Sequence, residues 1–267
     1  MPRLLFAAAT ALLLLSCRPS ASPPTPPPAQ AVIDSAVATH GGPVLNQAVV
    51  RFTFRGDQYR LRHDGGRFHY RRAYTDSLGR RVHDGLTNAG PYRTIAGDTI
   101  ALSEAEQRSV HTKVNSVAYF TLLPRPLQDP AVQPTYEARD TVQGTVYHRL
   151  RVTFRKDGGG QDWDDVFLYW IATDTYEMDY LAYAYGLGSD DTDPGTRFRA
   201  AYNVRRINGV RFADYKNYTA PSLPPDQMHR YPALRAQEAL TLVSRVALDR
   251  VAVRMNQDGS PGTAPSE

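Results

Sequence analysis

The chain has 267 residues, of which 42% are hydrophobic and 22% charged, so it has enough apolar side chains to bury the core of one large domain. Its only cysteine is Cys17, which excludes an intramolecular disulfide and a cysteine-based metal site. The formal net charge of +4 is a small basic excess, compatible either with an anionic partner or with an ordinary solvated surface.

The first seventeen residues predict export and lipidation. A short basic start, Met1–Arg3, precedes an apolar run over Leu4–Leu15, which is too short to span a bilayer of ~30 Å. Residues 14–17, Leu-Leu-Ser-Cys, then match the lipobox of bacterial lipoproteins. We therefore predict a signal peptide over residues 1–16 and acyl chains on Cys17, which make the lipid bilayer a partner.

Export also determines the expected compartment and the expected polyanion. Arg18 follows the lipidated cysteine in place of an inner-membrane retention aspartate, which favours the outer membrane and its periplasmic face. An exported protein does not meet nucleic acid, so we expect anionic lipid headgroups or lipopolysaccharide instead. We expect a monomer.

Composition divides the rest of the chain into three parts. Residues 17–30 hold six prolines and no bulky apolar residue, which predicts an extended tether. Residues 31–255 are predicted to form one domain, and residues 256–267 a disordered tail. At the start of the domain, Ala31–His40 predicts a helix that ends at a glycine pair, with His40 as a capping or packing residue.

Alternating apolar and polar residues predict strands in the first half of the domain. His63–Gly66 has the composition of a hairpin turn. The expected strands cover residues 48–55, 58–62, 68–71, 80–86, 92–95 and 99–102.

One helix is predicted to interrupt the strands. Ser103 and Glu106 have the spacing of a capping box. Val110, Val114 and Val117 then recur on one helical face, which predicts an amphipathic helix that must end before Pro124.

The second half is again dominated by strands, over residues 135–142, 145–155, 166–172, 176–185, 196–205 and 210–218. A proline-broken loop over 221–235 and a helical turn over 236–240 precede a last strand, 241–255, with a bulge near Asp249-Arg250. The sequence therefore predicts a mainly β fold of the α+β class. It is a curved antiparallel half-barrel of about ten or eleven strands, with the amphipathic helix packed on its concave side.

The later strands are apolar on both faces, so they must be covered on both sides or line a cavity. We consider two alternatives, a cavity for an acyl chain and a core that side chains fill completely. In the first, the segment Tyr119–Leu127 forms a lid. The candidate cavity and lid residues are Val114, Val117, Tyr119, Phe120, Leu122, Leu123, Phe167, Tyr169, Trp170, Tyr180 and Tyr183.

Arginines occupy the polar face of several two-sided strands. They form either a basic patch that faces a membrane or lipopolysaccharide, or an ordinary solvated surface. The candidate patch is Arg51, Arg55, Arg60, Arg62, Arg149, Arg151 and Arg155.

Catalytic and metal-binding signals are weak. The acidic clusters over 162–165 and 190–193 have the composition of turns, and the second lacks the pattern of a calcium loop. The seven histidines lack zinc-ligand spacing, and Gly158–Gly160 opens no helix. We therefore predict no enzyme, no metal site and no cofactor.

Several short stretches resemble a family of Gram-negative lipoproteins of unknown function. They cover most of residues 31–253 and include His40–Gly42, Tyr74–Gly79, Val114–Phe120, Leu127–Val132, Val152–Phe154, Gly158–Gly160, Asp164–Phe167, Met178–Tyr183 and Arg197–Arg199. In its order of strands and helix the chain also resembles LolA/LolB-like lipoprotein carriers. That resemblance implies a curved sheet around a hydrophobic cavity and transfers no catalytic residue.

Two functional hypotheses result. The first is a membrane-anchored lipoprotein that binds an acyl chain, a lipid or the lipid of another lipoprotein in a half-barrel cavity. The alternative is a non-enzymatic interaction module of the cell envelope that docks through its arginine-rich sheet face.

Overall fold

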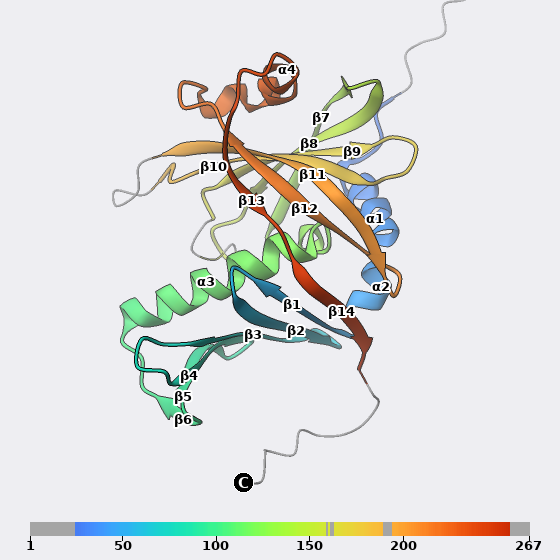
Figure 1. The fold of residues 1–267 in the computed structure, drawn as a ribbon. Coiled ribbons are helices and arrows are strands. Elements are labelled where there is room, and N and C mark those ends of the chain that lie inside the picture. Colours follow the sequence, from blue (N-terminus) through green and yellow to red (C-terminus); the bar gives the residue numbers. More distant parts are fainter. Residues whose placement is uncertain (1–24, 159, 161–162, 189–193, 257–267) are drawn as a thin grey trace, which may run out of the picture.

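The computed structural model describes residues 25–158, 160, 163–188 and 194–256 (Figure 1). The predicted signal peptide, the lipidated Cys17 and part of each acidic cluster lie outside these residues. Asn256, predicted as the first residue of the tail, is tied to the domain. Its backbone N–H donates to Gln47 O at 2.7 Å, and its side chain donates to His63 O at 2.6 Å.

Two antiparallel sheets of seven strands each make up the fold, which is mainly β, open and curved. The first sheet has the order β14 (Asp249–Met255), β1 (Ala48–Phe54), β2 (Asp57–Asp64), β3 (Arg67–Thr75), β4 (Arg81–Thr87), β5 (Gly90–Ile95) and β6 (Asp98–Ile100). The second has the order β13 (Thr241–Val246), β12 (Val210–Thr219), β11 (Gly195–Ile207), β10 (Met178–Tyr185), β9 (Val166–Ala172), β8 (Thr145–Phe154) and β7 (Val132–Val142).

The end of the chain joins the two sheets. The predicted last strand is broken into β13 and β14, which pair with different sheets (Figure 1). The predicted bulge is confirmed, since Arg250 has a φ of 52° and the β1–β14 register shifts between Arg51 and Thr53. The described residues form fourteen strands, and the thirteen strand ranges predicted along the chain account for all of them once the last range is divided. The total of about ten or eleven predicted for the half-barrel was therefore too low.

The helices follow local sequence signals. They are α1 (Ala29–Thr39), α2 (Gly42–Leu45), α3 (Glu104–Leu122) and α4 (Tyr231–Ala236), with 3₁₀ turns η1 (Arg125–Gln128) and η2 (Pro225–Arg230). The capping box of α3 is confirmed, because Glu106 N–H donates to the Ser103 hydroxyl and Ser103 N–H donates to the Glu106 carboxylate. The helical turn predicted over 236–240 lies earlier, at α4, where a proline occupies the first turn.

Helix α3 lies between the two sheets (Figure 1). Its first half packs Val110 and Val114 against Leu86 of the first sheet. Further along, Ala118 and Leu122 join the core of the first sheet. Tyr119 and Phe120 turn toward the second sheet, so the helix closes the space between the sheets. No helix among the described residues has the length and apolar character needed to cross a bilayer.

The second sheet is covered on both faces. Helix α1 and residues 123–127 cover the face toward α3, where they pack on Leu150, Tyr169 and Leu181. The opposite face is covered by η2 and α4, whose Met228 and Tyr231 are fully buried. The two-sided apolar strands predicted this double covering. The proline-broken loop that supplies the second cover was not predicted in that role.

Candidate functional site

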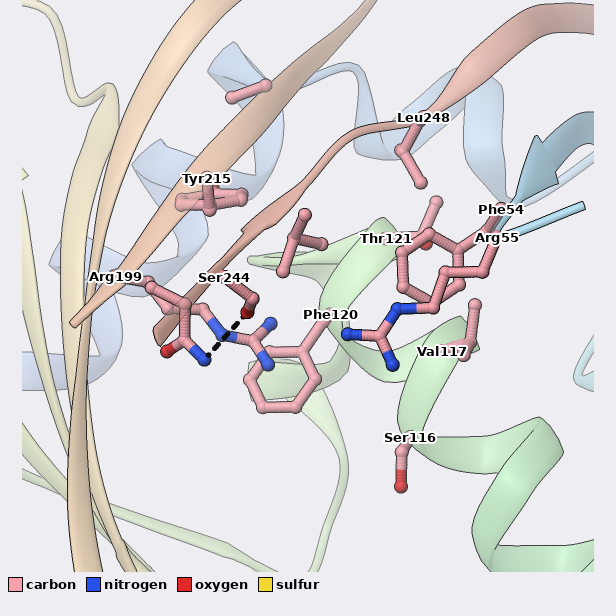
Figure 2. Close-up of a pocket in the computed structure, with 13 residues that line it drawn as sticks. Phe54, Arg55, Ser116, Val117, Phe120, Thr121, Arg199, Tyr215, Ser244 and Leu248 are labelled. Atoms are coloured by element: carbon pink, nitrogen blue, oxygen red, sulfur yellow. Dashed lines mark hydrogen bonds between the residues drawn. The ribbon is translucent and has the colours of Figure 1, made fainter. Parts of the chain in front are cut away.

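A hollow of about 190 Å³ lies where α3 passes the end of β1 and the strands β12 and β13 (Figure 2). The two-residue β1–β2 turn, Arg55-Gly56, has positive φ at both positions, as a tight hairpin requires. The hollow is lined by Phe54, Arg55, Ser116, Val117, Phe120, Thr121, Arg199, Ala213, Tyr215, Asn217, Ser244, Val246 and Leu248.

Phe120 lies at the inner wall of this hollow and begins an aromatic cluster. Its ring centroid lies 5.5 Å from those of Tyr119 and Tyr183 and 6.4 Å from that of Phe167. The Phe167 ring in turn stacks on Tyr169 and Tyr183. These contacts form an apolar wall between α3 and the second sheet.

Arg199 of β11 is the unusual residue of the site. It is only 9% exposed, and its guanidinium carbon lies 3.6 Å from the centroid of the Phe120 ring. Its one hydrogen bond within the described part of the chain, to the Tyr183 hydroxyl, is long at 3.4 Å, and its Nε has no partner there. A buried cation therefore faces the hollow beside an aromatic ring.

Polar groups of β12 and β13 lie next to Arg199. The Asn217 amide donates to the Ser244 hydroxyl at 3.4 Å, while Asn217 Oδ1 is buried and has no partner among the described residues. Burial raises the pKa of Tyr215 to about 12, so its hydroxyl stays protonated at neutral pH. The hollow thus has an apolar side, on α3 and β1, and a polar side, on the second sheet.

A second, larger hollow of about 550 Å³ lies along the opposite side of α3. Helix residues Asn115 and Tyr119 border it, together with Tyr70 of β3 and Arg125 of η1. The Tyr119 and Tyr169 hydroxyls are hydrogen-bonded at 2.8 Å. The second half of α3 therefore has open space on two sides.

The predicted cavity residues are distributed over several environments. Val117 and Phe120 line the first hollow, and Tyr119 borders the second. Tyr183 contacts both Phe120 and Arg199. Five further members are buried in the packed cores: Val114, Leu122, Leu123, Phe167 and Tyr169. The predicted lid segment, Tyr119–Leu127, is the last turn of α3 followed by η1.

The placement of Trp170 and Tyr180 in the same cavity is wrong. Both face the opposite side of the second sheet, where their rings lie 5.9 and 5.7 Å from that of Phe198, under Tyr231. Successive side chains of a strand alternate between faces, so Trp170 and Tyr169 cannot line one cavity. The predicted cavity had included residues from both faces of β9 and β10.

Sequence reasoning missed Arg199, Asn217 and Ser244 as residues of the hollow. A signal was present at Arg199, since it lies in β11 two residues before Ala201, which packs against the core on the same face of the strand. Asn217 and Ser244 gave no signal, because single polar residues in strands usually face solvent.

The seven predicted patch arginines do not share one face. Arg149 forms ion pairs with Glu137 and Asp140, and Arg151 lies 3.5 Å from Glu137. Arg155 donates to Pro130 O, Arg62 pairs with Asp64, and Arg55 reaches the first hollow. The single patch is therefore wrong, because acidic residues of neighbouring strands neutralise part of it and two sheets divide the rest.

Arg51 and Arg60 do form part of a basic row on the outer face of the first sheet. Arg51 lies directly opposite Arg60, which lies directly opposite Arg71. They line a shallow hollow of about 570 Å³ together with Arg81 and Arg250, and none of its lining residues is acidic. Burial and then the neighbouring guanidiniums lower the pKa of Arg60.

Metal-ligating side chains do not converge in the part of the chain that the structure describes, where no three His, Cys, Asp or Glu side chains form a group. Of the acidic clusters, Asp164 accepts a hydrogen bond from the Gly188 N–H, and Asp162 and Asp190–Asp193 lie outside the described residues.

Comparison with known proteins identifies the family. A family model described as "Family of unknown function (DUF6503)" matches residues 13–247, so the chain belongs to this family. The predicted membership in a family of unknown function is thereby confirmed. A search of curated proteins finds no match.

Solved structures give distant likenesses. The LolA superfamily protein of Nitrosomonas europaea is similar at 10% identity and a TM-score of 0.48, over 88% of this chain and 96% of that one. A DUF1329 family protein of Desulfovibrio piger is similar at 12% identity and a TM-score of 0.39, over 87% and 95%. The Mycobacterium tuberculosis lipoprotein LppX is similar at 12% identity and a TM-score of 0.26, over 59% and 89%. We transfer no residue role from these proteins.

Proposed function

We propose that this member of the DUF6503 family is a non-enzymatic, membrane-anchored lipoprotein that holds a hydrophobic ligand between α3 and the second sheet. The ligand is an acyl chain, either of a free lipid or of another lipoprotein. The observation that carries the proposal is the pair of hollows on opposite sides of α3, of about 190 and 550 Å³, beside a continuous aromatic wall.

Helix α3 acts in this proposal as the lid. Its first half is fixed by Val110 and Val114, which are fully buried against the first sheet. Its second half, around Phe120, is bordered by both hollows. In this proposal the ligand occupies the space beside this half, and each methylene group that it buries contributes about 0.8 kcal/mol of binding free energy.

The proposed anchor is the acylated Cys17, followed by a proline-rich segment that keeps the domain near the membrane. We propose the outer membrane, on its periplasmic side, as the location. There the domain would meet lipids and the acyl chains of other lipoproteins.

Lipid that co-purifies with the full chain tests this function. Organic extraction releases only non-covalently bound lipid, so the acyl chains on Cys17 do not contribute. We expect a stoichiometric lipid by mass spectrometry from the wild-type chain and less than a tenth of it from Phe120→Asp, which places a charge in the aromatic wall.

A second variant, Thr121→Trp, fills the first hollow without adding charge and is expected to lose lipid in the same way. The controls are Leu78→Asp, at a side chain that is 73% exposed, and Lys113→Trp, on the exposed face of α3; both should retain lipid. A lipid-free wild-type chain, or equal lipid in folded Thr121→Trp, would remove the basis of the proposal.

The outer basic row favours a second candidate function, docking to a polyanionic component of the envelope. Like charges directly opposite each other destabilise a sheet, so the Arg51–Arg60–Arg71 row carries a cost that an anion would relieve. The lipopolysaccharide phosphates have the required charge.

Capture on lipopolysaccharide-coated beads tests this candidate. Reversal of the row to glutamate at Arg51, Arg60 and Arg71 should abolish capture at physiological salt, while Arg245→Glu, at an exposed arginine of β13, should leave it within about twofold. Equal capture of both variants would eliminate the row as a docking surface.

A further inference from the structure

The hollow beside α3 contains an unsatisfied cation. Of the five N–H donors of a guanidinium, Arg199 uses one, in the long bond to the Tyr183 hydroxyl. Its Nε is buried without a partner, and it forms no ion pair with any described residue. Among the arginines of the described residues, Arg211 is similarly buried, but it is paired with Asp179 at 2.7 Å.

Aromatic contacts compensate Arg199 only in part. Phe120 covers one face of the guanidinium at 3.6 Å, and the Tyr183 ring lies 5.5 Å away. Such contacts act on the face of the cation. The in-plane N–H groups, which match the two oxygens of a carboxylate, are left for a ligand.

The surroundings favour an anion. Figure 2 shows the Arg55 guanidinium, from the β1–β2 turn, and the Arg199 guanidinium, from β11, on either side of the Phe120 ring. No acidic side chain among the described residues lines the hollow. Ser244, which also lines it, supplies a neutral hydroxyl, and Tyr215 a second one whose high pKa keeps it a donor.

We infer that the hydrophobic ligand is a single-chain carboxylate amphiphile, of the fatty-acid class, whose carboxylate binds Arg199 and whose chain lies along Phe120 and the aromatic wall. The inference rests on the proposed function. A buried charge without a partner is costly, and an anionic head on the ligand removes that cost when the site is filled.

The size of the hollow favours a small anionic head with a single chain. A volume of about 190 Å³ is below the range of about 300–1,000 Å³ that is usual for sites of drug-sized ligands. It accommodates a carboxylate and the first methylene groups of one chain.

Binding of four dodecyl amphiphiles to the purified full chain tests the inference. Isothermal titration at pH 8 is carried out with dodecanoate, 1-dodecanol, dodecylammonium and dodecyl phosphate. We expect dodecanoate to bind at least tenfold more tightly than 1-dodecanol, the effect of a charge-assisted hydrogen-bonded pair. Dodecylammonium should bind most weakly, and dodecyl phosphate more weakly than dodecanoate.

The variant Arg199→Met removes the charge and keeps an unbranched side chain. It should abolish the preference for dodecanoate and leave 1-dodecanol binding within about threefold. It should also leave the thermal midpoint of the ligand-free chain unchanged or higher, which a purely structural arginine would not do. The matched control is Arg245→Met, which removes an exposed arginine from β13 and should retain the preference.

The outcomes separate the two proposals. If none of the four amphiphiles binds, the proposed function itself fails. If dodecanoate and 1-dodecanol bind equally to the wild-type chain, the function stands and the carboxylate inference is overturned. Tighter binding of dodecyl phosphate overturns the choice of a carboxylate. An unchanged preference in Arg199→Met overturns the role of Arg199.

Discussion

At the scale of single residues, the buried charges of this protein fall into two kinds. Asp84 of β4 is fully buried and receives two hydrogen bonds from Arg93, at 2.6 and 3.1 Å, with Arg72 3.8 Å away. Arg199 is buried without a carboxylate among the described residues. We interpret the paired carboxylate of Asp84 as a group that stabilises the first sheet. We interpret the unpaired guanidinium of Arg199 as a group that binds an anionic ligand.

Asp84→Asn tests the first kind. The substitution removes the carboxylate paired with Arg93, while Arg72 keeps its pair with Asp57 at 2.6 Å. Loss of one partner of a buried pair costs about 3–5 kcal/mol of unfolding free energy. Urea denaturation measures the change. Asp64→Asn, which breaks the exposed Arg62 pair, should cost no more than about 1 kcal/mol. Similar small losses for both variants would show that the Asp84 pair does not stabilise the sheet.

His40 connects α1 to both β10 and β12. Its Nδ1 donates to Ala36 O at 2.8 Å, and its Nε2 accepts from Met178 N–H at 3.4 Å and faces Arg211 at 3.3 Å. Burial, and then the charge of Arg211, lower the pKa of His40 to about 4. Glu177 opposes this shift and Arg206 adds to it. The folded protein therefore needs the neutral ring.

This histidine predicts a pH dependence of stability. The unfolded chain binds a proton on His40 below about pH 6.5 and the folded chain only below about pH 4, so stability falls as pH decreases from 6.5 to 4. His63, whose pKa burial also lowers to about 4, contributes to the same window. Urea midpoints between pH 7 and pH 4 should show the decline. His40→Gln should reduce its slope, and His229→Gln, at an exposed site, should not.

The prediction that His40 is a capping or packing residue is confirmed, since it caps α1 and is buried. The sequence did not reveal which residue His40 contacts across the fold. Arg211 lies far along the chain and meets His40 only because β12 passes the end of α1. Long-range partners of this kind, Arg199 with Phe120 included, depend on the register of strands and cannot be read from local spacing.

At the scale of elements, the corner between α1 and α2 is fixed by a close approach of two backbones. Gly41 has a φ of 89°, and a Cβ there would lie 2.5 Å from Gly209 O in the β11–β12 turn. The same corner brings His40 O to the N–H of Arg211 at 3.1 Å. The predicted glycine cap therefore also serves as the contact between the helix and the second sheet.

A comparison of Gly41→Ala with Gly56→Ala separates the cost of a positive φ from the cost of a steric clash. Gly56 also has a φ near 90° but has open space around its Cβ position, so Gly56→Ala should cost only about 1 kcal/mol. Gly41→Ala adds a steric clash and should lower the unfolding free energy by at least about 2 kcal/mol more. Thermal or urea unfolding measures both. Equal losses would mean that the corner tolerates the extra carbon.

Element prediction succeeded where the signal was local. The capping box at Ser103 and the bulge at Arg250 were both predicted, because each depends on a few adjacent residues. The position of α4 was not, because Tyr231 is held by burial against Phe198, a contact with β11. Tertiary packing decided the location of that short helix.

At the scale of the whole molecule, the organising feature is a curved pair of sheets joined by β13 and β14 and closed by α3 (Figure 1). The fold class could be predicted from the alternation of apolar and polar residues along the strands. The candidate site followed only in part, since Val117 and Phe120 were predicted and the polar side of the hollow was not. Apolar strands with two buried faces do not reveal which face borders open space, and the separation of Trp170 from Tyr169 is the result.

Photo-cross-linking tests the central claim most directly. A dodecanoate analogue with a diazirine midway along its chain is bound to the full chain, irradiated and mapped by peptide mass spectrometry. We expect adducts on peptides that contain Val117, Phe120 and Leu248, and the loss of these adducts in Thr121→Trp. Adducts confined to the η2–α4 face or to the outer surface of the first sheet would contradict a ligand site beside α3.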